Sequence, residues 1–198
     1  EAGNLVLFYG IGRRLHGRAE ALRRSWIYGA LFIPVIVLLN TFDNVVLFFL
    51  LWIVLLALDR RPAGAGVAAA LGFMTKLVPA AGLPAAWLHL PAWSQRARLV
   101  AAVVLVVLLI ALPFLLAGPE HFLPAFTAMM DRGSWETVWA LIDGYYSFGV
   151  AGGPDRFDPA DAGAAQHPSA LPSLPITIVF GLLYLWLLTR RARWQEPR

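Results

Sequence analysis

Long apolar runs separated by clusters of arginine constrain the fold of this chain more than any other feature. Hydrophobic residues make up 59% of the sequence and charged residues only 14%, and the mean hydropathy is +0.66. Because the core of a soluble domain does not contain apolar runs of this kind, they predict membrane-spanning helices. The sequence therefore predicts an all-α, polytopic transmembrane helical bundle, and it excludes a secreted or soluble domain.

The arginines indicate which ends of these helices face the cytoplasm. Most of them form four clusters: Arg13, Arg14, Arg18, Arg23 and Arg24; Arg60 and Arg61; Arg96 and Arg98; Arg190, Arg191, Arg193 and Arg198. Because basic residues concentrate in cytoplasmic loops, we expect all four clusters in the cytoplasm of a multi-pass cell-membrane protein, and the acidic segment 118–171 outside. Membrane topology also explains the net charge of +4, so no nucleic-acid partner is expected.

Successive arginine clusters on one side require an even number of crossings between them. The apolar runs 26–42 and 45–58 supply the first pair, with Asp43 and Asn44 as an external turn. At about 1.5 Å per residue, each run is only some 20 to 25 Å long. We therefore expect short paired helices in a thin slab, or a turn that dips into the membrane.

The second pair of crossings is predicted to be a broken hairpin. Residues 64–77 enter, Pro79 and Gly82 interrupt the helix, and residues 83–90 return. Lys76, the only lysine of the chain, then stands at the hairpin tip near the external side. A cation at the centre of a membrane helix costs roughly 2.5 to 3.5 kcal/mol, so it usually faces a bundle interior, a wet cavity or an anion. Snorkelling of a long side chain to the interface is the alternative.

The predicted organisation has three parts: transmembrane helices and hairpins in 1–117, an external loop in 118–171, and a final helix with a basic cytoplasmic tail in 172–198. Residues 100–116 form a spanning helix that leads outward, and residues 175–188 return. Within the loop, residues 135–146 have helical apolar spacing and aromatic side chains typical of an interfacial helix. Residues 5–11 look like the end of a helix whose beginning is absent, so we expect the C-terminal portion of a larger protein.

Metal and cofactor sites have little support in the sequence. The chain has no cysteine, and its four histidines lack the spacing of metal ligands. We expect no structural metal and no cofactor, while a catalytic divalent cation stays open.

Five polar residues are candidates for chemistry near the external edge. Lys76 and Arg132 suit an anionic head group, because lysine supplies a point charge and arginine a fork for phosphate oxygens. Asp43 is a candidate acid or base, and Glu136 is a candidate catalytic carboxylate that also orients Arg132. Tyr145 is a candidate for stacking on a sugar. The simpler alternatives are an external turn at Asp43, a helical Arg132–Glu136 ion pair and an aromatic interface belt.

Two segments of the chain resemble a known family. The apolar pair PVIVLLNTFDNVVLFFLLWIVLLAL followed by AGAGVAAALGFMTKLVPAAGLPAAWL is similar to the middle of bacterial GT-C membrane glycosyltransferases. The closest resemblance is to the polyprenol-phosphate-mannose-dependent mannosyltransferases, which carry a G-x-x-x-K-x-x-P hairpin. The later DRGSWETVWALIDGYYSFG resembles a segment of that branch, with Arg132, Gly133 and Glu136 matching and Thr137 replacing the usual serine.

This resemblance implies a polyprenyl-phosphate-linked sugar donor and an inverting transfer of mannose or another hexose on the extracytoplasmic side. The catalytic base of such enzymes lies in a first external loop, so we expect it in an additional N-terminal part or on a partner chain. Asp43 replaces a glutamine-containing turn of the branch and gains no role from the resemblance. A noncatalytic membrane subunit or scaffold that binds lipid or partner helices is the alternative, and a transporter is a third, disfavoured reading.

Overall fold

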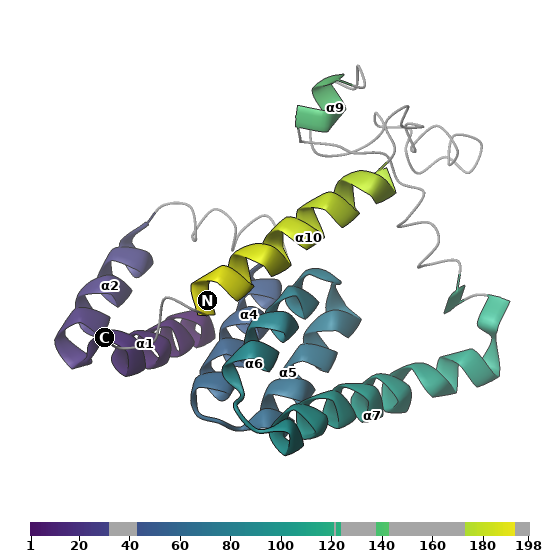
Figure 1. The fold of residues 1–198 in the computed structure, drawn as a ribbon, viewed down its shortest axis with the longest axis horizontal. Helices are drawn as coiled ribbons and strands as arrows, with labels where there is room; N and C mark the ends of the chain where they lie inside the picture. The colour runs from purple at the N-terminus through teal and green to yellow at the C-terminus, as the bar shows by residue number, and fades with distance from the viewer. Residues whose placement is uncertain (32–42, 121, 124–137, 143–172, 193–198) are drawn as a thin grey trace. The chain divides into compact units, whose positions relative to one another are not determined.

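The computed structural model describes residues 1–31, 43–120, 122–123, 138–142 and 173–192, and the regular structure in these ranges is helical. In chain order the elements are α1 (Ala2–His16), α2 (Arg18–Ala30), α4 (Asp43–Leu58), α5 (Pro62–Thr75), the 3₁₀ helix η1 (Val78–Ala81), α6 (Gly82–His89), α7 (Trp93–Ala117), α9 (Val138–Ile142) and α10 (Ser173–Ala192) (Figure 1). The predicted all-α class is confirmed for this part of the chain. The chain forms two compact units, Glu1–Leu112 with Leu188–Arg198, and Pro113–Leu187.

The first unit begins with a hairpin of α1 and α2 that reverses at Gly17. The φ angle of Gly17 is 83°, a conformation that glycine adopts readily, and its N–H donates to the Arg13 carbonyl at 3.2 Å. The rings of Phe8 and Tyr28 stack across the hairpin with 5.1 Å between centroids. The first arginine cluster therefore ends α1 and begins α2 instead of forming a loop, and the apolar run expected from residue 26 starts inside α2.

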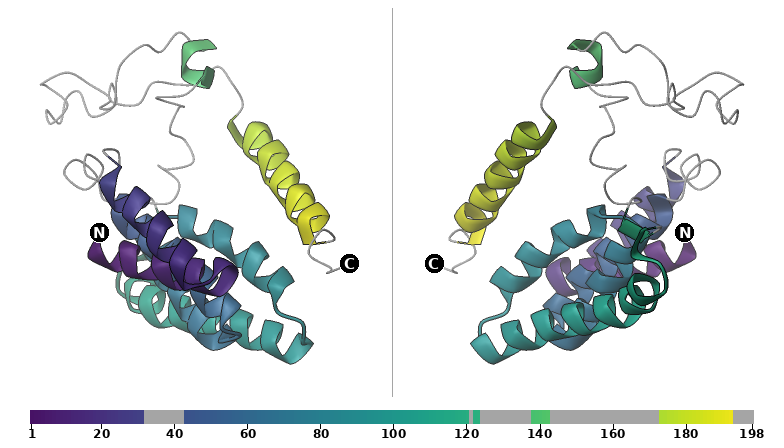
Figure 2. Two further views of the ribbon diagram at one scale, coloured as in Figure 1. Left: turned by 90° about the vertical axis from the view of Figure 1, so that its left-hand side faces the viewer. Right: turned by 90° about the vertical axis from the view of Figure 1, so that its right-hand side faces the viewer.

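Helix α4 packs against α1, α5 and α6 in the first unit (Figure 2). Helix α1 runs parallel to it. At one end, a Cβ added to Gly3 would lie 3.0 Å from the Phe48 ring. At the other end, Arg14 donates two hydrogen bonds to Asp59 just beyond α4, from Nε to Oδ1 and from Nη2 to Oδ2 at 2.8 Å. The α1–α2 hairpin is thereby held along the length of α4.

Helix α5 ends at Thr75 and α6 begins at Gly82, so the predicted helix break is confirmed, although Gly82 starts α6 instead of interrupting the helix. The two membrane crossings assigned to this hairpin stay a prediction. Both helices and η1 pack against α4. Pro79 of η1 folds back on α5, because a Cβ added to Gly72 would lie 2.6 Å from Pro79 Cβ and 2.8 Å from Phe49 Cβ. No side chain fits in this gap, so Gly72 forms a notch that receives the proline.

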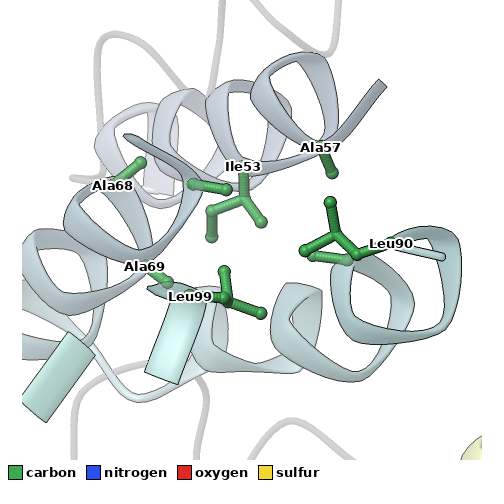
Figure 3. Close-up of a cluster of buried hydrophobic side chains, with 8 residues drawn as sticks. Ile53, Ala57, Ala68, Ala69, Leu90 and Leu99 are labelled. Atoms are coloured by element: carbon green, nitrogen blue, oxygen red, sulfur yellow. The ribbon is translucent and has the colours of Figure 1, made fainter. Parts of the chain in front are cut away.

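Small side chains form the core of the first unit. Its buried members are Ile53, Ala57, Ala65, Ala68, Ala69, Ala86, Leu90 and Leu99, of which Figure 3 labels six. A Cβ added to Gly66 would lie only 2.4 Å from the Leu99 carbonyl oxygen and 2.8 Å from Ala102 Cβ. The backbones of α5 and α7 therefore touch directly, which is how helices associate when the solvent is lipid and small residues set the distance.

We expect Gly66→Ala to lower the midpoint of thermal unfolding in detergent. Relieving a contact of 2.4 Å to a backbone oxygen requires α5 and α7 to separate. Overpacking of this kind costs about 1–3 kcal/mol, more than the roughly 1 kcal/mol that alanine gains over glycine in a helix. Gly181→Ala in α10 is the matched control, because a Cβ there meets nothing within 4 Å. Equal midpoints for the two variants would contradict the close packing.

Helix α7 is, in the part of the chain that the structure describes, the one helix both long and apolar enough to cross a membrane. Its 25 residues span about 37 Å, and they contain the predicted spanning segment 100–116. Helices α4 and α5 and the apolar part of α10 are shorter. Pro113 lies inside α7, where it removes one backbone hydrogen bond.

The second unit contains α9 and most of α10. The predicted return segment 175–188 lies within α10, and Trp139 of α9 packs edge-on against Phe180 with 6.3 Å between ring centroids. The predicted amphipathic helix 135–146 lies outside the described residues apart from 138–142. Its interfacial position and the three-part division of the chain stay predictions.

Candidate functional site

Lys76 and Asp43 form an ion pair in the first unit, although 33 positions separate them in sequence. The Lys76 Nζ atom donates to Asp43 Oδ1 at 2.6 Å. Each side chain is 50% exposed, so the pair is accessible to a ligand. The sequence predicted both residues at one edge of the protein, and the structure brings them into contact.

The local backbone explains why Lys76 stands at this point. Lys76 is the first residue after α5 and adopts an extended conformation, with φ −161° and ψ 146°. Its N–H and the Thr75 hydroxyl both donate to the Gly72 carbonyl, at 2.9 and 2.7 Å, and close the helix end. Pro79 then seats against Gly72 and turns the chain towards α6. The G-x-x-x-K-x-x-P pattern is therefore one structural unit, in which a glycine notch and a proline hold the lysine at the helix end.

Helix polarity favours both charges of the pair. Asp43 lies in the first turn of α4, where the sequence predicts a turn instead, and a carboxylate is favourable at that helix end. Lys76 follows the last turn of α5, where free carbonyl groups favour a cation. Because α4 and α5 are antiparallel neighbours, these two ends meet.

Arginines gather at the opposite end of the first unit. Arg14 pairs with Asp59 just beyond α4. Arg96 donates to the Leu90 carbonyl at 2.8 Å and lies over the Trp87 ring at the junction of α6 and α7. The charges of this unit are thus separated, with the Asp43–Lys76 pair at one end of the helices and arginines at the other.

A second polar group lies at the Asp43 end, and sequence reasoning missed it. Asn4 is 1% exposed, and its Nδ2 donates to the Asn44 carbonyl at 3.0 Å. The Tyr28 hydroxyl donates to Glu1 Oε1 at 2.7 Å. The signal for these residues was an asparagine at the start of an apolar run. They tie the beginnings of α1 and α4 to the end of α2.

The other predicted site residues, Arg132, Glu136 and Tyr145, lie outside the described residues. Their roles stay predictions. Within the described ranges, no group of three acidic or histidine side chains is arranged to hold a metal ion. The expectations about metals and cofactors also stay predictions.

The Asp43–Lys76 pair offers two chemical capabilities at one place. An accessible ammonium binds anionic oxygens, above all those of phosphate. A carboxylate beside it either fixes the position of the ammonium or accepts a proton from a hydroxyl.

The described part of the chain is helical, and one of its helices is long and apolar enough to cross a membrane. The family follows from comparison with family models: the chain belongs to glycosyltransferase family 87, whose model matches residues 2–198. This is a membrane family of the GT-C type, as the sequence resemblance implies. The comparisons with curated proteins and with solved structures give no match.

Proposed function

We propose that this protein transfers mannose or another hexose from a polyprenyl-phosphate donor on the extracytoplasmic side of the membrane. The observation that carries the proposal is the 2.6 Å contact between Lys76 and Asp43, half-exposed at the helix ends opposite the arginines. Membership of a glycosyltransferase family supports the reaction type. At the membrane surface, where we place the external ends of these helices, the anion that an integral membrane protein meets is a lipid phosphate.

The donor phosphate binds Lys76 in this proposal. An ammonium on the extended backbone after α5 supplies a fixed positive charge, and Arg132 adds a guanidinium fork from the external segment. Glu136 orients Arg132. As the bond between the anomeric carbon and the phosphate oxygen breaks, negative charge grows on the phosphate. Cations placed there beforehand stabilise the transition state more than the bound donor.

The acceptor hydroxyl completes the reaction. Its oxygen attacks the anomeric carbon from the face opposite the phosphate, which inverts the configuration, and its proton passes to a carboxylate. Asp43 contacts the ammonium that binds the leaving phosphate, so it serves as this carboxylate only if it leaves Lys76 when the donor binds. A base outside this chain or upstream of it is the other candidate. In the second case Asp43 positions Lys76. Tyr145 stacks on the sugar ring.

The proposed topology places the arginine end in the cytoplasm and segment 118–171 outside. Helices α4 and α5 have 16 and 14 residues, about 24 and 21 Å, which is short for a full hydrocarbon slab. The α4–α5 turn and the α5–α6 turn can therefore reach the two opposite membrane surfaces only if the bilayer around them is locally thin. Lys76 then reaches the external interface.

Single-cysteine labelling tests this topology without background, because the chain has no cysteine. We expect Glu120→Cys to react with a membrane-impermeant maleimide in intact cells. Arg61→Cys should react only after the membrane is permeabilised. Labelling of Arg61→Cys in intact cells would reverse the proposed orientation.

The proposed activity has a direct test. The purified protein is incubated with a polyprenyl-phosphate-linked mannose and a membrane extract as acceptor source, and the release of polyprenyl phosphate is measured. We expect release above the rate of hydrolysis without protein. If polyprenyl phosphate is released neither from the mannose-linked donor nor from donors linked to other hexoses, the noncatalytic alternative replaces the enzyme.

A further inference from the structure

An apolar groove lies between α1 and α2, apart from the Asp43–Lys76 pair. It has a volume of about 570 Å³ and is partly open to the outside. Its walls include Leu5, Val6 and Tyr9 from α1, and Leu22, Trp26 and Gly29 from α2. None of the lining residues that the structure describes is charged, and Ser25 supplies one buried hydroxyl. These described walls fit hydrocarbon better than a charged head group.

The groove extends towards the end of the helices that carries the Asp43–Lys76 pair. On α2 it runs from Leu22 to Ala30, the last residue of the helix and about 12 Å away. On α1 it includes Leu5, next to Asn4, whose side chain donates to the Asn44 carbonyl. Asn44 directly follows Asp43 in the first turn of α4.

We propose that this groove holds the isoprenoid chain of the lipid-linked donor while the donor phosphate binds Lys76. The inference rests on the proposed function and adds a chain-binding site to it. A lipid anchored by its phosphate at one end of the helices must place its hydrocarbon along a nearby helix face. The α1–α2 face is hollowed and apolar there, and Asn4 connects it by a hydrogen bond to α4 beside Asp43.

The groove contributes to binding of the isoprenoid chain through its shape more than through the hydrophobic effect. Bilayer hydrocarbon is as apolar as the groove wall, so moving an isoprenoid chain between them gains little from the hydrophobic effect. Preference for an isoprenoid chain over bilayer lipid then comes from its contact with a preformed surface. Trp26, which is 77% exposed, contributes a broad ring to that surface. A moderate effect on affinity, greater for long chains than for short ones, is what this mechanism predicts.

Gly29→Leu tests the site by filling it. A Cβ at Gly29 would lie 3.2 Å from Leu5 Cδ1, the flexible end of a side chain, so leucine enters the groove without meeting backbone. We expect the Kd for a long-chain polyprenyl phosphate to rise about threefold to tenfold, with the Kd for farnesyl phosphate almost unchanged. Gly181→Leu makes the same exchange in an open stretch of α10 and should change neither value.

Photocrosslinking locates the chain independently of affinity and of sugar transfer. A polyprenyl phosphate with a diazirine in its chain should label the peptides of α1 and α2 in the wild type and less so in Gly29→Leu. A diazirine phospholipid should label the exposed faces of α7 and α10 instead, where Leu109 and Leu182 are 72% and 62% exposed.

Three results would overturn the inference. The first is equal labelling of α1 and α2 by both probes, and the second is an unchanged long-chain Kd in Gly29→Leu. The third is loss of binding for both chain lengths with an altered unfolding midpoint. Because these readouts need no transfer, they stand even if the protein releases no sugar. If only the transfer assay fails, the proposed function is refuted. The Kd values and the crosslinking then still show whether the groove binds the isoprenoid chain.

Discussion

Lys76→Ala is expected to reduce hexosyl transfer by about 100-fold or more. The substitution removes the only lysine of the chain, whose ammonium contacts Asp43. If Lys76 binds the leaving phosphate, the lost interaction is strongest in the transition state, and losses of this size are typical for one such group. Initial rates at saturating donor measure the effect. Stability should change little, because a half-exposed ion pair contributes only about 0–1 kcal/mol.

Three companion variants sharpen this test. Lys76→Arg keeps the charge with another geometry and should retain part of the activity. Arg18→Ala removes a cation from the arginine end of the helices and should leave the rate unchanged. Asp43→Asn keeps the shape of the side chain and removes its charge. A flattened pH–rate profile in Asp43→Asn marks a proton acceptor, whereas an altered KM with the same profile marks a residue that positions Lys76. Full activity in Lys76→Ala would end the phosphate-site proposal.

Gly72→Val is expected to lower both stability and transfer. Its Cβ would lie 2.6 Å from Pro79 and 2.8 Å from Phe49, and the branched side chain adds more atoms to the same gap. Overpacking costs about 1–3 kcal/mol or more, and valine also fits a helix less well than alanine does. Because Pro79 must leave the notch, the backbone after α5 moves and Lys76 moves with it. The unfolding midpoint in detergent and the transfer rate measure the two effects.

Gly64→Val in the same helix is the matched control. Its Cβ would meet only the flexible methyl groups of Leu56, at 3.4 Å, so we expect a small change in the midpoint and none in the rate. Gly72→Ala is the milder version and should show intermediate losses. If Gly72→Val kept the wild-type rate, the glycine–proline notch would not be what positions Lys76.

The broken hairpin shows what local sequence predicts well. Pro79 disfavours a continuous α-helix through backbone geometry alone, so its position in the sequence was enough to predict the break between α5 and α6, although Gly82 begins α6 with helical angles. The side of the membrane that the arginine clusters face stays a prediction. Asp43 was predicted at the correct end but in a turn, because an aspartate followed by an asparagine favours turns and helix starts alike.

The site residues divide in the same way. Lys76 was found because a single cation in an apolar run is costly and therefore informative. Its 2.6 Å contact with Asp43 depends on how α4 and α5 are aligned, which no short-range pattern encodes. The polar group of Glu1, Asn4 and Tyr28 was missed for the same reason, since its members come from two helices and are ordinary residues individually.

The amino-acid sequence by itself determined the membrane family, the helical class and the break after α5, because these follow from hydropathy, charge and backbone restrictions within a few residues. Only the tertiary structure decided that Asp43 meets Lys76, that Pro79 enters the notch at Gly72, and that α1 and α2 enclose an apolar groove. Each of these depends on the distance between two helices, and that distance is set by glycine and alanine contacts far apart in the chain.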